Sequence, residues 1–163
     1  MRRLVPLLAV LVLAACGGSS QHATTTTTAA SPAPPGPGKV LYAGGDWTVV
    51  VDGSRATAFH RAGGTWRADR SGRVKIAILG PKRGAKVARI PQVAVELSAR
   101  QPLVESGLWV DGVELQVKGG GLTPTKGTIY GAPAAPLARG EHLAVAYGRT
   151  DVTGSAVAWL FQV

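Results

Sequence analysis

The sequence predicts an all-β protein built from short antiparallel strands. Valine, threonine and tryptophan recur in short stretches where apolar and polar residues alternate, which is the pattern of a strand with one buried face. Extended runs of apolar residues at helical spacing are absent. The chain also contains 22 glycines and 11 prolines, many of which stand between the alternating stretches. Glycine and proline at such positions favour the tight turns that join neighbouring strands.

Residues 1–15 have the composition of an export signal. Two arginines near the N-terminus are followed by an apolar run over 4–13, and two alanines stand just before Cys16. The run is much shorter than the roughly 20 residues that a membrane-spanning helix needs. A cleaved signal peptide is therefore favoured over a transmembrane segment.

The stretch Leu13-Ala14-Ala15-Cys16 resembles the lipobox of bacterial lipoproteins. This resemblance implies removal of residues 1–15 and acylation of Cys16, which would anchor the exported chain to the outer side of the cell membrane. Cys16 is the only cysteine, so no internal disulfide can form. An unpaired thiol in an exported protein favours modification. The alternative is an ordinary secretory signal cleaved near the two alanines, with an incidental cysteine.

Residues 16–38 are predicted to be a disordered tether. A glycine and serine stretch is followed by five consecutive threonines over 24–28 and by a proline-rich stretch over 31–38. These residues offer almost no apolar side chains to bury, so they are expected to stay unfolded. The threonine run is either a site of O-glycosylation or a plain spacer.

Residues 39–79 are predicted to form an antiparallel β-meander. Three turn-forming dipeptides, Asp52-Gly53, Gly63-Gly64 and Ser71-Gly72, occur at intervals typical of hairpins. A small sheet of this kind cannot bury a core of its own, so it is expected to pack on the residues that follow. The predicted strands cover 40–42, 46–51, 55–61, 65–70 and 73–79.

Residues 80–163 contain a second set of alternating segments. The dipeptide Asp111-Gly112 lies between two of them and is a strong signal for a two-residue hairpin. The three glycines at 119–121 are predicted to end that hairpin, and residues 132–136 form a proline-rich connection. The predicted strands cover 87–90, 93–98, 108–110, 113–117, 127–130, 142–147 and 156–163.

The same residues resemble bacterial immunoglobulin-like domains of cell-surface proteins. The motifs that carry this resemblance are Gly80-Pro81 with Gly84, Trp109-Val110-Asp111-Gly112, Leu137 to His142, and Trp159 to Val163. The resemblance implies an immunoglobulin-like antiparallel β-sandwich over about 80–163, used as a spacer, adhesion or interaction module. It also places His142 where an aromatic side chain bonds back to the backbone at the start of a strand. A fold of this kind does not specify a function.

The sequence contains no recognisable catalytic or metal-binding pattern. The three histidines, His22, His60 and His142, show none of the HxxxH or HExxH spacings, and no serine lies in a Gly-x-Ser-x-Gly motif. Asp111 and Glu114 are interpreted as a turn residue and a solvated strand residue. The sequence therefore predicts no enzyme, no metal site and no cofactor.

Positive charge is concentrated in one segment. The formal net charge is +9 for the whole chain, and residues 55–89 hold ten basic residues against the single acid Asp69. One interpretation is a solvated sheet face. The other is a binding surface for anionic wall polymers or lipid headgroups, since nucleic acid is an improbable partner outside the cell.

These observations predict a membrane-anchored lipoprotein that acts without catalysis as an interaction or structural module of the cell envelope. The alternative is a binding protein for anionic envelope polymers or glycans, in which Trp66 stacks on a sugar ring and nearby arginines hold an anion. Another envelope protein is a further candidate partner. The predicted binding residues are Arg61, Trp66, Arg67, Arg70 and Arg73.

Overall fold

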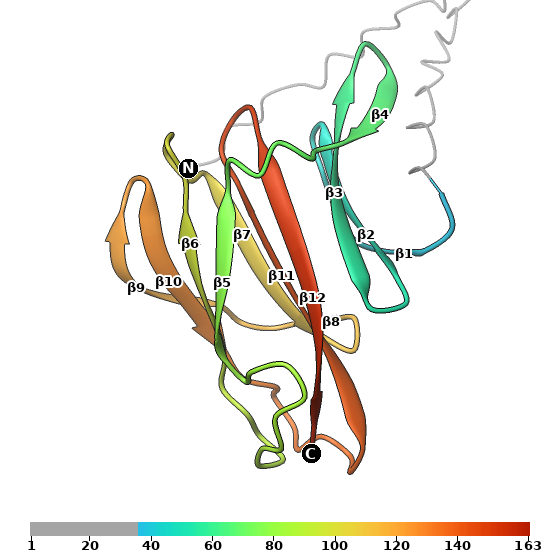
Figure 1. The fold of residues 1–163 in the computed structure, drawn as a ribbon, viewed down its shortest axis with the longest axis vertical. Coiled ribbons are helices and arrows are strands. Elements are labelled where there is room, and N and C mark those ends of the chain that lie inside the picture. The colour runs from blue at the N-terminus through green and yellow to red at the C-terminus, as the bar shows by residue number, and fades with distance from the viewer. Residues whose placement is uncertain (1–35) are drawn as a thin grey trace, which may run out of the picture. The chain divides into compact units, whose positions relative to one another are not determined.

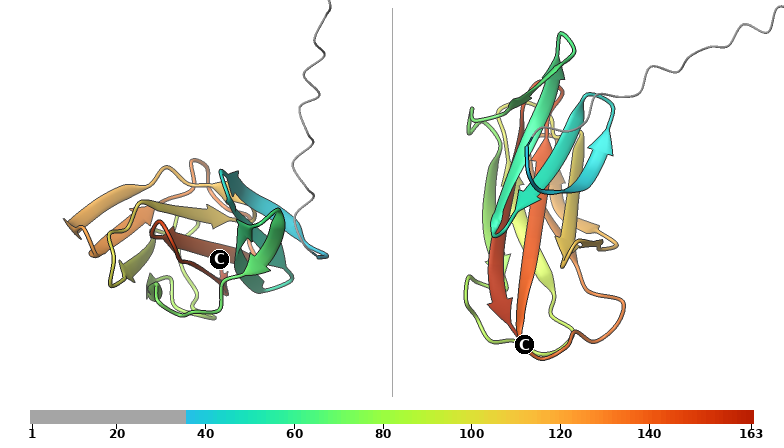
Figure 2. Two further views of the ribbon diagram at one scale, coloured as in Figure 1. Left: turned by 90° about the horizontal axis from the view of Figure 1, so that it is seen from above. Right: turned by 90° about the vertical axis from the view of Figure 1, so that its right-hand side faces the viewer.

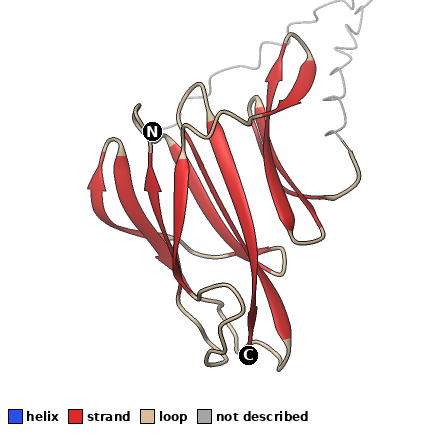
Figure 3. Ribbon diagram, in the orientation of Figure 1, coloured by secondary structure: helices blue, strands red, loops and turns tan. Residues whose placement is uncertain are grey.

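The computed structural model describes residues 36–163, apart from the side chain of Leu122, and its only regular elements are β-strands (Figure 3). The predicted all-β class is confirmed. The predicted signal peptide, Cys16 and most of the predicted tether lie outside the described residues. The strands are β1 (Lys39–Gly44), β2 (Trp47–Asp52), β3 (Arg55–Ala62), β4 (Thr65–Ala68), β5 (Lys75–Gly80), β6 (Val93–Ser98), β7 (Glu105–Val110), β8 (Val113–Glu114), β9 (Lys118–Thr123), β10 (Lys126–Gly131), β11 (Glu141–Arg149) and β12 (Gly154–Gln162).

These strands form three four-stranded antiparallel sheets (Figure 1). The meander sheet has the order β1-β2-β3-β4, the central sheet β12-β11-β7-β8, and the outer sheet β5-β6-β10-β9. One apolar core lies between the central and outer sheets, and a second lies between the central and meander sheets. Figure 2 shows the meander strands and the outer strands on either side of the central ones. The predicted packing of the meander on the later strands is confirmed.

Strand β11 shows why the central sheet can be covered on both faces. Ala144 and Ala146 belong to the core against the outer sheet, whereas Val145 and Tyr147 belong to the core against the meander sheet. All four are fully buried, so β11 reads as an unbroken apolar run instead of an alternating one.

The two sheets of the sandwich have the strand order of an immunoglobulin fold. If β5 is taken as strand A, the outer sheet is A-B-E-D and the central sheet is G-F-C-C′. The first strand of this sandwich is therefore β5, whereas the sequence prediction assigned residues 73–79 to the meander. Ile78 pairs with Val95 of β6, and no strand pairing joins β5 to β4. An alternating pattern shows that a segment is a strand but not which sheet it joins, so the turn signal Ser71-Gly72 was misread as a hairpin.

A second difference concerns the three glycines at 119–121, which lie within strand β9 instead of ending a hairpin. Gly119 and Gly120 pair with Ile129 and Thr128 of β10. Pairing of this kind uses only backbone groups, so it forms without the side-chain pattern on which strand prediction depends. The predicted strand at 87–90 is not a regular strand: Val87 donates a backbone hydrogen bond to β12 beside the bridge at Lys86, and the Arg89 carbonyl accepts one from Leu137.

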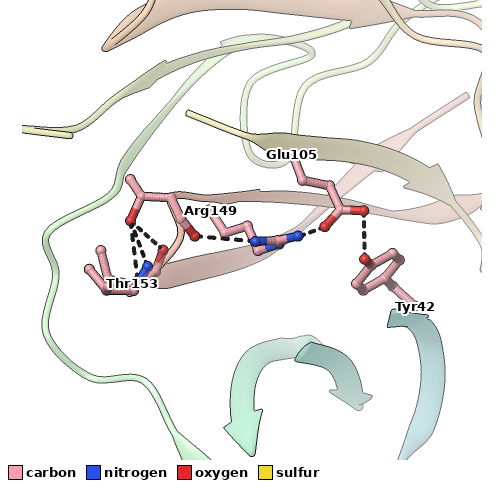
Figure 4. Close-up of polar contacts among 6 residues, drawn as sticks. Tyr42, Glu105, Arg149 and Thr153 are labelled. Atoms are coloured by element: carbon pink, nitrogen blue, oxygen red, sulfur yellow. Dashed lines mark hydrogen bonds and ion pairs between the residues drawn. The ribbon is translucent and has the colours of Figure 1, made fainter. Parts of the chain in front are cut away.

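A chain of polar contacts ties the meander sheet to the central sheet (Figure 4). The Tyr42 hydroxyl on β1 donates to Glu105 Oε1 of β7 at 2.5 Å, and Arg149 Nε of β11 donates to Glu105 Oε2 at 2.6 Å. Burial and the hydrogen bond to Glu105 raise the pKa of Tyr42 to about 12. The Tyr42 ring also lies 5.3 Å from that of Tyr147, so polar and aromatic contacts act together at this junction.

His142 occupies the corner at the start of β11. Its Nε2 lies 2.9 Å from the Ala138 carbonyl oxygen, four residues earlier, and its Nδ1 lies 2.6 Å from Asp111 Oδ2. Asp111 Oδ1 also accepts the backbone N–H of Leu143 at 2.9 Å. His142 thus contacts the backbone four residues upstream of it, at the start of a strand. Because a carbonyl and a carboxylate only accept, both contacts are hydrogen bonds when the imidazole is protonated.

The hydrogen bond to Asp111 raises the pKa of His142 despite the opposing effect of burial. A raised pKa in the folded state means that the stabilisation is fully present below the unfolded pKa, about 6.5, and is lost as pH rises through the folded pKa. We expect His142→Gln to lower the free energy of unfolding by about 1–3 kcal/mol at mildly acidic pH and by less at alkaline pH.

Urea denaturation at a series of pH values between mildly acidic and alkaline measures this dependence. His60→Gln is the matched control, because His60 stacks on Trp47 and lies in no pair with a carboxylate among the described residues. A difference between wild type and His142→Gln that stays constant with pH would contradict a protonated corner.

A basic recess as the candidate functional site

The connection from β4 to β5 passes from the meander sheet to the outer sheet and carries Arg70 and Arg73 (Figure 1). It lies beside the turn between β11 and β12, where Thr153 contacts it. Three hollows of about 320, 410 and 210 Å³ open here, and Arg73 lines all of them. We call the three together the basic recess.

Asp69 holds the connection in place. Its carboxylate accepts hydrogen bonds from Ser71 N at 2.8 Å, Thr153 Oγ1 at 2.6 Å and Gly154 N at 2.8 Å. Burial alone raises the pKa of the Asp69 carboxyl, but the hydrogen bonds from Thr153 and Ser71 outweigh it, so this pKa lies below its ordinary value. The Thr153 hydroxyl donates to Asp69 and therefore accepts from Ser71 Oγ, 2.6 Å away. We call this set of bonds the Asp69 latch.

The recess carries an excess of positive charge. Asp69 is the one carboxylate among its lining residues, and its oxygens are occupied by the latch. The ion pairs found in residues 36–163 lie elsewhere and leave five exposed cations of the recess without an acidic partner. These cations are Arg67, Arg70, Arg73, Lys75 and Arg100. Like charges gathered on a concave surface create a positive potential that attracts anions.

The predicted site residues separate into two groups. Arg67, Arg70 and Arg73 line the recess, whereas Arg61 and Trp66 do not. In the β3–β4 hairpin Arg61 pairs with Trp66 and His60 with Arg67, and successive pairs point to opposite faces. The Arg61 guanidinium carbon lies 5.7 Å from the centre of the Trp66 ring, and Arg61 also pairs with Asp46 at 3.0 Å.

Three basic side chains of the recess were absent from the predicted set: His60, Lys75 and Arg100. Arg100 follows β6, and the pairing of Lys75 with Ser98 brings it beside the start of β5. The sequence contains no signal for this neighbourhood, because it depends on which strand β5 joins. His60 stacks on Trp47 with ring centres 4.6 Å apart, so its ring is held against the meander sheet.

The basic residues that follow β5 lie at its other end. Lys82 Nζ donates to the Ile78 carbonyl at 2.6 Å, Arg83 to that of Ala158 at 3.1 Å, and Arg89 Nε to that of Leu137 at 2.9 Å. These side chains therefore bond to backbone carbonyls of β5, of β12 and of the connection that holds Leu137. The charge that is continuous in sequence is thus divided between two ends of the fold.

Comparison with known proteins identifies no relative: no family model matches this chain, and no curated protein matches it. In residues 36–163, no group of three His, Cys, Asp or Glu side chains is arranged to hold a metal ion. This part of the chain also has no helix of the length and apolarity needed to cross a membrane.

We expect Asp69→Asn to lower the free energy of unfolding by about 1–3 kcal/mol at neutral pH, because the latch loses a charged acceptor for three donors. Since the folded pKa of Asp69 is depressed, its stabilisation is present above the unfolded pKa, about 3.9, and is lost as pH falls through the folded value. Urea denaturation at neutral and acidic pH measures both effects.

Asp46→Asn provides the control for this comparison. Asp46 pairs with Arg61 at the surface, with 58% of its side chain exposed, and such pairs contribute about 0–1 kcal/mol. Equal losses for the two variants would contradict the role of the latch.

Proposed function

We propose that this chain is a membrane-anchored bacterial lipoprotein that acts without catalysis as an interaction module of the cell envelope, binding anionic envelope polymers through the basic recess. The observation that carries the proposal is the gathering of five cations without acidic partners around one recess. The lipobox-like stretch Leu13-Ala14-Ala15-Cys16 supports the anchor and the exported location.

The chemistry of the recess favours binding over acid–base catalysis. Four of its five unpartnered cations are arginines, which stay protonated at any physiological pH and donate hydrogen bonds in a fixed fork. Such groups hold oxyanions well but do not exchange protons near neutral pH. The sheets beneath them supply a rigid support, since the central sheet is packed on both faces.

The magnitude of the attraction suits a polymer better than a single small anion. An exposed ion contact contributes about 0.2–1 kcal/mol, so five contacts contribute at best about 5 kcal/mol, which corresponds to a Kd of roughly 0.2 mM. Many anchored copies that meet one long polymer raise the effective affinity without any new contact. Stacking of a sugar on Trp66 would be a separate event, because Trp66 lies on the other face of the β3–β4 hairpin from Arg67.

The full-length protein, purified in a neutral detergent, is expected to bind purified anionic wall polymer at low salt and to release it at high salt. The Debye length falls from about 30 Å at 0.01 M salt to about 3 Å at 1 M, so exposed charge attraction is largely screened. Co-sedimentation with the polymer measures binding, and a neutral polysaccharide is the control ligand.

Two triple variants that remove the same charge locate the surface. The first variant, which should abolish co-sedimentation, carries alanine at Arg67, Arg70 and Arg73 of the recess. The control variant should keep most of the co-sedimentation, because it carries alanine outside the recess, at Arg55, Lys86 and Arg139. An absence of binding at low salt, or equal losses for both variants, would refute the proposal.

The anchor is tested separately by Cys16→Ser. We expect the wild-type chain to be found in the membrane fraction with a mass that includes an acyl modification, because two or more acyl chains hold a protein stably on a bilayer. The serine variant should lack that mass and leave the membrane fraction. A Cys16→Ser chain that remains with the membrane would rule out lipidation as the anchor.

A further inference from the structure

We propose that the basic recess binds a linear chain of phosphate groups that passes over Arg73, with successive phosphates held on either side of it. This inference rests on the proposed function, since it names the chemical class of the anionic polymer. Arg67 and Arg70 would hold the chain on the meander side, and Lys75 and Arg100 on the outer-sheet side.

The arrangement of the hollows indicates a chain and not a single anion. The hollow of about 320 Å³ extends from Arg73 toward His60 and Arg67, and the hollow of about 410 Å³ extends from Arg73 toward Lys75 and Arg100. A third, of about 210 Å³, is lined by Arg73, Arg100 and Gln101. Arg73 thus lies where the three hollows meet, and other cations lie on both sides of it.

The cations are also held apart by the fold. Arg67 belongs to β4, where it pairs with His60, and Lys75 belongs to β5, where it pairs with Ser98. The Asp69 latch fixes the connection between these two strands to Thr153 and Gly154. Because Arg67, Lys75 and Arg100 are attached to separate elements and like charges repel, the arrangement disfavours closure of all five cations on one small ion. A ligand with several anionic groups at intervals matches this arrangement.

The lining favours phosphate over a sugar ring or a carboxylate. The aromatic ring that reaches the recess, His60, has one face stacked on Trp47, so at most its other face is open to a sugar, and five cations surround the hollows. Ser98 and Gln101 add neutral polar groups near Arg100. A tetrahedral phosphate presents oxygens in several directions and can accept from cations on both sides of the chain, whereas a carboxylate presents two oxygens in one plane.

Linear inorganic polyphosphate is the probe, with orthophosphate, a polyglutamate of similar length and vesicles of anionic phospholipid as the other arms. Calorimetry of the full-length protein in neutral detergent should show polyphosphate binding about 100-fold tighter than orthophosphate, because a chain makes several contacts at once. It should also bind about tenfold tighter than polyglutamate, a difference of about 1.4 kcal/mol.

Single substitutions test the path of the chain. Arg73→Ala should weaken polyphosphate binding about tenfold and Arg73→Lys by less, since lysine keeps the charge but loses the fork. Arg67→Ala and Arg100→Ala should each weaken it about three- to fivefold, because each acts on one side only. Arg55→Ala, an exposed arginine outside the recess, is the matched control and should change binding less than twofold.

The outcomes separate this inference from the proposed function. Equal affinity for polyglutamate, tightest binding to vesicles, or orthophosphate binding as tight as the chain would overturn the phosphate chain but leave the recess as a polyanion site. Equal effects of Arg73→Ala and Arg55→Ala would overturn the path over Arg73. If wall polymer and every probe fail to bind at low salt, the proposed function fails with it. The free energies of unfolding of the surface arginine variants should lie within about 0.5 kcal/mol of that of the wild type, which confirms that the variants fold.

Discussion

Burial of the central sheet on both faces is the constraint on which the rest of the structure depends. Trp109 packs with the meander sheet, and Trp159 packs with the outer sheet and donates its indole N–H to the Pro81 carbonyl at 2.8 Å. Both rings are almost fully buried. Neither flanking sheet has another layer in the described residues to pack against, so both cores depend on strands β7, β11 and β12.

This layering also explains where the candidate site forms. Strands β4 and β5 follow one another in sequence but lie in sheets on opposite faces of the central sheet. The connection between them must therefore pass around the edge or end of that sheet, and the Asp69 latch holds it against the β11–β12 turn. The arginines of the connection are exposed there because the carboxylate, and not the guanidinium groups, makes the internal bonds.

Local pattern identified many features correctly. Alternation located most strands, and the Asp111-Gly112 turn has positive φ at both residues, as a two-residue hairpin requires. The local pattern failed where the fold depends on which strand a segment pairs with. Residues 73–79 alternate equally well for either sheet, and glycines 119–121 pair through backbone groups that leave no mark in a side-chain pattern.

The sequence by itself determined the all-β class, the turns and the total charge, because these depend on side-chain period, backbone freedom and composition, which are local properties. The tertiary structure decided which strands share a sheet and which charges share a surface. Strand β5 separates the basic residues of the recess from Lys82, Arg83 and Arg89 at its other end, and strand pairing adds Arg100 to the recess. Pairing between distant segments depends on burying complementary faces, so it appears only once the layers have been assembled.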